Sequence, residues 1–218
     1  LYKKAKKLER SISIIGERIN LHTQKIINIE ESINFLDSLL SSNFENDHQK
    51  LIRILDLQEE LEEHLLKTNQ RKTTSRLKKQ KISNHLELLT PEGVSIQVGR
   101  NHRQNEFISI KKAKKGDLWF HAQECVGSHV VLKASIKIPS EADIQIAADL
   151  AALFSKSKGN KKTPIVMTQI EKLKKIPGVL PGTVTHSGGI VLWGESNRGI
   201  KHISTNSSRD GLSSNKSP

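Results

Sequence analysis

Apolar residues follow a seven-residue repeat through the first forty positions of the chain. They recur at spacings that alternate between four and three residues, and His22 stands at the one expected position that is not apolar. The repeat comprises Leu8, Ile12, Ile15, Ile19, Ile26, Ile29, Ile33, Leu36 and Leu40. With this spacing, the apolar side chains lie along one side of an α-helix and form a continuous apolar seam. At 1.5 Å per residue, the seam predicts a helical arm about 50 Å long.

A second apolar stripe follows the turn-rich segment Ser41–Asp47. It consists of Leu51, Ile54, Leu61 and Leu65, and Asp47 is a suitable N-cap for it. A short loop between two striped helices indicates an antiparallel pair, so residues 1–85 are predicted to form an antiparallel coiled-coil hairpin. The pattern leaves open whether this arm reaches a partner or only spaces or dimerises domains. The basic stretch Arg71–Lys81 fits either a solvated helix end or a phosphate contact.

The pattern changes at about His85, from helical periodicity to short alternating runs. Leu86–Thr90 and Val94–Val98 flank a Pro-Glu-Gly turn and predict a β-hairpin. Two further strands are expected at Thr163–Gln169 and Ile190–Trp193. The chain after His85 is therefore expected to contain a small sheet.

Two helices are predicted within the same region. Arg103–Gly116 has Asn101 as its N-cap and Gly116 as its left-handed C-terminal residue, with Phe107, Ile110 and Ala113 facing the core. Ser140–Gly159 begins with a capping box of Ser140 and Asp143 and presents small residues on one face. The fold class is therefore α+β: a coiled-coil arm (1–85), a mixed α/β domain (86–203), and a Ser/Asn-rich tail (204–218) that we expect to be disordered.

The stretch Gly116–Leu132 contains the most unusual chemistry of the domain. It reads GDLWFHAQECVGSHVVL and predicts two strands joined by a polar turn. Successive side chains of a strand point to opposite faces, so Trp119 and His121 share a face and His129 can join them. A Trp and two histidines on one surface suit base stacking and donation to phosphate. The competing interpretation is that Trp119 belongs to the core.

Charge narrows the class of partner. The chain carries a formal net charge of +12 with a pI near 9.8. Residues 86–218 hold 19 basic and 11 acidic side chains, so this part of the chain carries most of the excess positive charge. This balance favours a polyanionic partner. The single cysteine excludes an internal disulfide framework, and no apolar run approaches the roughly 20 residues that span a membrane. The chain begins without Met, and we expect a piece of a longer protein.

Two clusters of lysines are candidate phosphate contacts. Lys111, Lys112, Lys114 and Lys115 lie in the last turns of the first predicted helix, and Lys156 and Lys158 lie at the end of the second. Cations at a helix C-terminus also complement the helix dipole. Because four lysines exceed what capping needs, nucleic-acid contact is the favoured interpretation of the first cluster.

The residues do not indicate a metal or a catalytic centre. His121, Cys125 and His129 have a spacing that matches no standard zinc pattern. Adjacent Ser128 and His129 point to opposite faces of a strand, which disfavours a nucleophile–base pair. Phosphate-binding glycine motifs of nucleotide hydrolases are absent from the sequence. Binding is therefore favoured over catalysis, with no cofactor and no metal.

Two motifs in order carry a resemblance to a known family. The segment VGRNHRQNEFISIKKAKKGDLWFHAQECVGSHVVLKA (Val98–Ala134) resembles the NFACT-R domain of the NFACT family, and the similarity continues through Ile146–Lys158 and Ile170–His186. It covers roughly residues 86–195, and the preceding hairpin is similar to the family's middle coiled coil. The matching positions are Gly99, Arg100, Asn101, Gln104, Asn105, Asp117, Leu118, Trp119, Phe120, His121, Gly127, Ser128 and His129. Val126 departs from the family, which usually has Pro there.

The resemblance implies a cytoplasmic ribosome quality-control factor rather than an enzyme. It would bind an obstructed large ribosomal subunit through rRNA and help recruit tRNA for C-terminal tailing of stalled chains, with no membrane and no homo-oligomer. The family's N-terminal domain, which supplies the residues used for tailing, does not match any part of this chain. The candidate RNA-binding residues are Arg100, Asn101, Arg103, Gln104, Lys111, Lys112, Lys114, Lys115, Asp117, Trp119, His121, Ser128, His129, Lys156 and Lys158. Two alternatives stay open: a surface adhesin that binds fibronectin, and a tRNA-processing enzyme that uses His121 and His129.

Overall fold

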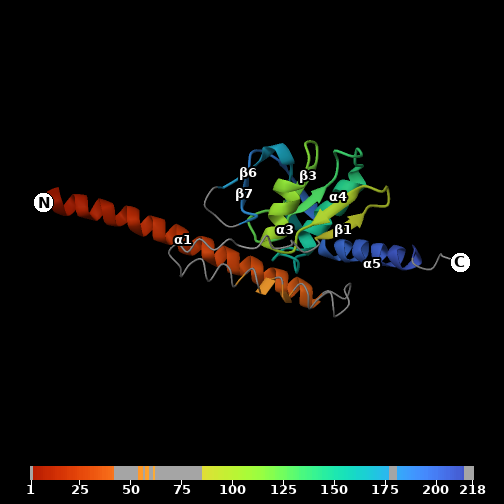
Figure 1. Cartoon of the computed structure of the whole chain (residues 1–218), viewed down its shortest axis with the longest axis horizontal. Helices are drawn as coiled ribbons and strands as arrows, with labels where there is room; N and C mark the ends of the chain where they lie inside the picture. The colour runs from red at the N-terminus through yellow and green to blue at the C-terminus, as the bar shows by residue number, and fades with distance from the viewer. Residues whose placement is uncertain are drawn as a thin grey trace, which may run out of the picture.

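A long helix and an α+β domain make up the architecture, as the sequence predicts (Figure 1). The computed structural model describes residues 2–41, 54–55, 57–58, 61, 85–176 and 181–213. Helix α1 (Tyr2–Ser41) is a single helix of 40 residues, which confirms the first half of the predicted arm. Residues 54, 55, 57, 58 and 61 are helical. Three predicted features lie outside the described residues. They are the turn after Ser41, the rest of the second helix and the basic stretch Arg71–Lys81.

The domain is built on a six-stranded antiparallel sheet with the order β1-β2-β4-β3-β5-β8. The strands are β1 (Leu86–Leu89), β2 (Ser95–Val98), β3 (Leu118–Ala122), β4 (Val130–Leu132), β5 (Thr163–Gln169) and β8 (Ile190–Gly194). A separate two-stranded sheet joins β6 (Leu173–Lys175) to β7 (Val184–His186). The predicted β1–β2 hairpin, the β3–β4 pair and the strand at Thr163–Gln169 are confirmed.

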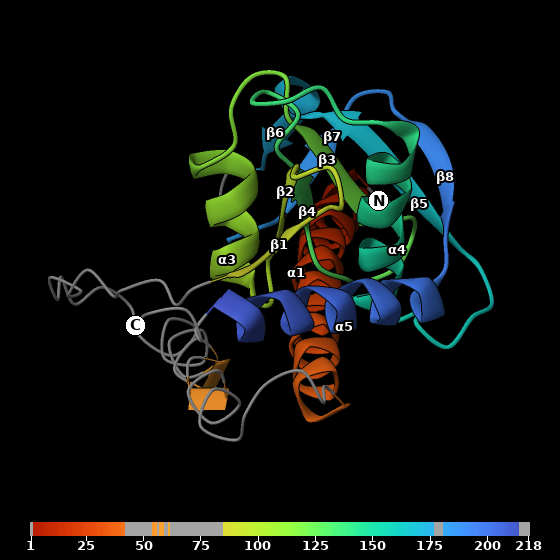
Figure 2. The same ribbon diagram turned by 90° about the vertical axis from the view of Figure 1, so that its right-hand side faces the viewer.

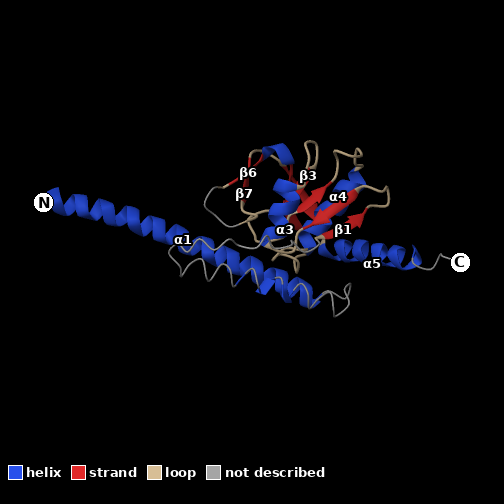
Figure 3. Ribbon diagram, in the orientation of Figure 1, coloured by secondary structure: helices blue, strands red, loops and turns tan. Residues whose placement is uncertain are grey.

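Helices cover both faces of this sheet. Figure 2 shows α3 (His102–Glu106) and α4 (Glu141–Leu153) on opposite sides of the strands, with α5 (Ser196–Ser213) crossing below them. Figure 3 distinguishes the strands of the domain from the helices and loops by colour. We call the face under α4 the first face and the face under α3 the second face.

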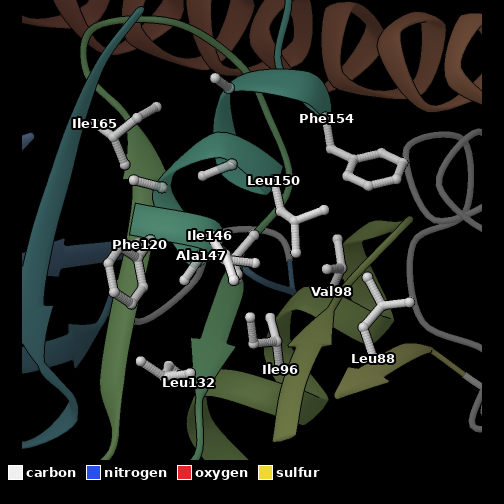
Figure 4. Packing of buried hydrophobic residues seen from close by; sticks show 14 of the residues in the cluster. Leu88, Ile96, Val98, Phe120, Leu132, Ile146, Ala147, Leu150, Phe154 and Ile165 are labelled. Atoms are coloured by element: carbon white, nitrogen blue, oxygen red, sulfur yellow. The ribbon is translucent and has the colours of Figure 1, made fainter. Parts of the chain in front are cut away.

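The first face holds the larger hydrophobic core. Phe120 and Leu132 point from β3 and β4 toward Ala147 and Leu150 of α4, and all four are fully buried (Figure 4). Ser140 and Asp143 form the predicted capping box at the start of α4. Small residues let α4 approach β8 closely, because a Cβ at Gly194 would stand 2.4 Å from the Ala148 carbonyl oxygen. The predicted small-residue face of this helix is therefore confirmed.

The predicted C-terminal ends of two helices are wrong. The helix expected over Arg103–Gly116 is the short α3 followed by a π-helical turn, Phe107–Lys111. The wider π turn shifts the phase of the side chains, so Ile108 is buried while Ile110 is partly exposed. Gly116 does have a left-handed φ of 93°, but it lies in the turn before β3. Helix α4 ends at Leu153 instead of Gly159, because Ser155 forms a β-bridge with Gly127.

The predicted disorder of 204–218 is also wrong for residues 204–213. Helix α5 continues through them to Ser213. Its first turns are anchored on α4, where Arg198 donates two hydrogen bonds of 2.8 and 2.9 Å to the buried Asp149 carboxylate. Ile203 is buried in the first-face core. These tertiary contacts start a helix that the Ser/Asn-rich composition does not indicate.

Candidate functional site

The second face of the sheet brings together most of the residues that the sequence singles out. Trp119 packs there with Ile108, Val131 and Val166 in a small cluster. The predicted placement of Trp119 and His121 on one face is confirmed, since their rings stack at 5.5 Å with an interplanar angle of 3°. Trp119 is only 3% exposed, so the indole is a core side chain and not an exposed stacking platform.

Three histidine rings surround the Trp119 indole, and we call them the histidine cluster. His129 meets Trp119 edge-on at 5.2 Å, and His186 of β7 lies at 5.9 Å. His121 and His129 are also in edge contact, at 5.4 Å. The sequence interpretation missed His186, which β7 brings back over the sheet from a distant part of the chain. Its position within the resemblance segment was the signal that could have indicated it.

Two of these imidazoles are held neutral. Burial lowers the pKa of His121, and burial together with the nearby His121 lowers the pKa of His129 well below its ordinary value. Ser109 Oγ lies 2.6 Å from His129 Nδ1 and donates its own proton to the Asn105 carbonyl. His129 Nδ1 must therefore carry the proton that it donates to Ser109. A buried neutral ring in this tautomer stabilises the fold and is not a cation for phosphate.

The motif that begins at Gly99 forms a closed hydrogen-bond system beside the histidine cluster. Asn101 caps α3 by accepting from the Gln104 backbone at 2.8 Å, and Gln104 Oε1 accepts from the Arg100 backbone at 2.9 Å. Asn105 Oδ1 accepts from the His129 backbone at 3.0 Å. A Cβ at Gly99 would stand 2.3 Å from that same Oδ1, so only glycine fits here without displacing it. The motif joins α3 to β4.

Asp117 is the anchor of the turn before β3. Its buried carboxylate accepts from the Lys114 backbone at 2.8 Å and from the Ser135 backbone at 3.1 Å, and it pairs with the buried Lys133 ammonium. Burial alone would raise the pKa of Asp117, but these hydrogen bonds hold it below the ordinary value. Asp117 is thus a structural ion in the described chain.

These contacts divide the predicted RNA-binding residues into two groups. Six of them have buried side chains and are unavailable for direct RNA contact in this structure: Asn101, Gln104, Asp117, Trp119, Ser128 and His129. The side-chain polar groups of Asn101, Gln104 and Asp117 hold turns and strands together, which is why these residues resemble binding residues in the sequence. Trp119 Nε1 and Ser128 Oγ are buried without a hydrogen-bond partner among the described residues. The structure leaves the lysines, Arg100, Arg103 and His121 at least partly exposed.

The exposed lysines of the π-helical turn join a second lysine group that the sequence analysis did not place among the RNA-binding residues. Glu106 is the link, with Lys111 at 3.6 Å and Lys175 of β6 at 3.0 Å. The Gly116 backbone also donates to Glu171 at 3.1 Å, which ties the turn before β3 to the segment before β6. We call the lysines of these two linked segments the basic surface; they are Lys111, Lys112, Lys114, Lys115, Lys172, Lys174 and Lys175.

The arm docks on the domain at the motif and at the end of α4. Glu31 of α1 lies 2.7 Å from His102 Nδ1, and Phe35 meets the same imidazole edge-on at 5.7 Å. Asn34 donates to the Phe154 carbonyl at 3.3 Å. Glu30 pairs with Lys156 at 2.9 Å, so this predicted RNA contact is engaged by the arm. Arg100 stands over the Phe154 ring at 5.8 Å, next to the junction.

Geometry gives no support to a metal centre in the described part of the chain. No group of three or more His, Cys, Asp or Glu side chains there is arranged to hold a metal ion. Cys125 packs partly against the first-face core, whereas His121 and His129 lie on the second face. None of the described helices is both long and apolar enough to cross a membrane.

Comparison with known proteins identifies relatives of both parts. Residues 85–188 match the family model "NFACT protein RNA binding domain". The chain is 36% identical over 192 residues to the Rqc2 homolog RqcH of Bacillus subtilis, covering 85% of this chain and 30% of that protein. It is 39% identical over 130 residues to the same-named protein of Streptococcus pneumoniae D39, covering 59% and 23%. The chain thus spans less than a third of the length of these relatives.

A solved structure shares the arrangement as well. It is the C-terminal part of the fibronectin/fibrinogen-binding protein of Streptococcus suis, with a TM-score of 0.72 and 32% identity. The similarity covers 92% of this chain and 76% of that one, so it includes the arm as well as the domain.

Proposed function

Because this chain belongs to the NFACT family, we propose that it is the arm and RNA-contacting part of a ribosome quality-control factor. The observation that carries the proposal is the basic surface. Its seven lysines lie on the π-helical turn, the segment that follows it and the segment of β6, which Glu106 and Glu171 connect. Within the described residues, Glu106 pairs with Lys111 and Lys175, and Glu87 pairs with Lys112, so the lysines outnumber the carboxylates that pair with them. Such a charge excess supplies sequence-independent affinity for an RNA backbone.

The partner we propose is the large ribosomal subunit obstructed by a stalled chain. The arm reaches along the subunit, the basic surface contacts rRNA or tRNA, and the factor helps recruit tRNA for C-terminal tailing. Docking of α1 through Glu31 and Phe35 supports this division, because a lever transmits its position only when its base is fixed. The relatives named RqcH are longer than this chain, so tailing itself would require the remaining part.

A binding role is favoured over catalysis. His129 is buried, neutral and committed to Ser109, so it is poorly placed as a general base for RNA. A tRNA-processing enzyme that uses His121 and His129 would turn over labelled tRNA. We expect no cleavage, and measurable turnover that disappears in His121→Ala would replace the binding proposal with an enzymatic one.

Co-sedimentation tests the proposal directly. The chain is centrifuged with purified large ribosomal subunits, beside a variant with Lys111, Lys114, Lys174 and Lys175 changed to Gln. The wild type is expected to sediment with the subunits at low salt, and the variant to remain mostly in the supernatant. A matched control changes Lys3, Lys4, Lys6 and Lys7 at the exposed start of α1 to Gln, which alters the net charge equally. Equal loss in the control would mean that lysines of the basic surface contribute no more than exposed lysines of the arm, which would contradict the special role proposed for the basic surface.

The name of the Streptococcus suis relative favours a second candidate, binding to fibronectin or fibrinogen. An adhesin must appear on the cell surface and bind immobilised fibronectin. We expect the full-length protein in the ribosomal fraction and only salt-sensitive, weak retention on fibronectin. Surface localisation together with fibronectin binding that survives the four-lysine change would favour the adhesin.

A further inference from the structure

We propose that the β8 end of the second face binds unpaired RNA nucleotides, with Trp193 as the stacking residue. Trp119 is buried, yet the domain has one other Trp, which is 57% exposed. The proposal rests on the RNA-binding function above and adds a subsite of stated chemistry to it. Trp193 lies outside residues 85–188, which match the RNA binding family model.

Strand register places Trp193 on the second face. His121 pairs with Val166 of β5, and Val166 pairs with Val191 of β8. Since Val166 packs with Trp119 on the second face, Val191 and then Trp193, two residues on, point to that face as well. Val191 is also half exposed. The uncovered end of this face therefore presents an indole and an aliphatic side chain to solvent.

A run of lysines borders this patch. Residues 156–162 read KSKGNKK, with four lysines and no acid, and lead into Thr163, which pairs with Gly194 next to Trp193. Lys162 reaches Glu195 at 3.9 Å, an exposed pair that costs little to break. An exposed aromatic ring beside a cationic loop is the combination that holds single-stranded nucleic acid, because bases stack and phosphates meet the cations.

An added peptide strand fits this edge less well. The Trp193 carbonyl already accepts a hydrogen bond of 2.9 Å from Gln145 of α4. Gly194 lies in close contact with the α4 backbone, so α4 covers the edge of β8 at its C-terminal end. The lysine run also favours a polyanion over an extended apolar segment.

The test compares binding of an oligouridine of about ten nucleotides with binding of an RNA duplex of equal length. Trp193→Ala is expected to weaken oligouridine binding about 5-fold to 100-fold, the range for loss of one base–aromatic stack, and to leave duplex binding unchanged. Trp193→Phe should keep most of the affinity. Ile190→Ala is the matched control, because Ile190 is 55% exposed on the same strand but points to the first face. Oligouridine should also quench Trp193 fluorescence.

The outcomes separate this inference from the function on which it rests. If the wild type binds both RNAs and Trp193→Ala binds oligouridine equally well, the stacking site is overturned and the RNA-binding function stands. If the wild type binds neither RNA, both fail. If an extended apolar peptide quenches Trp193 and oligouridine does not, the edge takes peptide strands and the inference is overturned. Retained near-ultraviolet circular dichroism from the buried Trp119 shows that Trp193→Ala is folded.

Discussion

The first face of the sheet packs aliphatic and aromatic side chains against α4, whereas the second face mixes a small apolar cluster with histidines, amides and a buried ion pair. Phe120 and Trp119 are neighbours in β3 and point to the two different faces. On the first face, burial of apolar area alone accounts for the packing. On the second face, several buried polar groups depend on a specific partner, as Asp117 depends on Lys133 and the His129 backbone on Asn105, and loss of such a partner is costly.

This difference separates the residues that shape the domain from those that we propose to contact RNA. The polar residues of the family motifs resemble a binding site in the sequence. In the structure, however, the side chains of Asn101, Gln104 and Asp117 accept hydrogen bonds from backbone groups of the protein itself. The lysines around them stay exposed. We infer that the motifs fix the frame on which the basic surface is displayed.

The largest expected effect tests whether both faces are true cores. Phe120→Ala and Trp119→Ala should each cost about 3–5 kcal/mol of unfolding free energy, because each removes a large buried ring. Chemical denaturation followed by far-ultraviolet circular dichroism measures both. A loss for Phe120→Ala with less than about 1 kcal/mol for Trp119→Ala would mean that the second face is not a packed core.

A smaller effect is expected from the hydrogen bonds of the second face. Asn105→Ala removes the acceptor for the His129 backbone and should cost about 1–3 kcal/mol, the penalty for a buried donor left unpaired. Asn160→Ala, at an exposed loop asparagine, is the control and should stay within about 0.5 kcal/mol. Equal stability of Asn105→Ala and wild type in thermal denaturation would contradict the structural role of the motif.

The neutral histidines predict a pH dependence on the acidic side of neutrality. The pKa values of His121 and His129 are lowered in the folded state, so below about pH 6.5 the unfolded chain binds more protons. Stability is therefore full above that pH and falls as the pH drops, by up to about 1.4 kcal/mol per pH unit for each histidine. Denaturation between pH 5 and 7 should show a shallower slope in His121→Gln. An unchanged slope would mean that this ring ionises normally in the fold.

Local sequence patterns predicted the first face and the strand alternation well. The capping box at Ser140 and the strand at Thr163–Gln169 depend on nearest neighbours, so they can be inferred without the fold. The π-helical turn was not inferred, and the sequence left the burial of Trp119 as one of two interpretations, because Leu173 of β6 and Val184 of β7 pack on the Trp119 cluster from a distant part of the chain. The arm junction is equally non-local, since Glu31 and His102 are far apart in the chain. His186 and Lys175 are also distant in sequence from the residues that they contact, so the sequence alone did not place them in the candidate site.

We propose that the exposed lysines bind RNA, whereas the buried motif residues only hold the domain in shape. The most direct measurement is the salt dependence of RNA affinity for wild type, Lys114→Gln/Lys174→Gln and Asn101→Ser, each checked for folding. Asn101→Ser keeps an N-cap oxygen and should retain the wild-type slope. The double lysine variant should lose about 0.7–0.9 units of slope per phosphate contact removed, with stability changed by less than about 0.5 kcal/mol. A wild-type slope in the lysine variant, or a flattened slope in folded Asn101→Ser, would contradict the account.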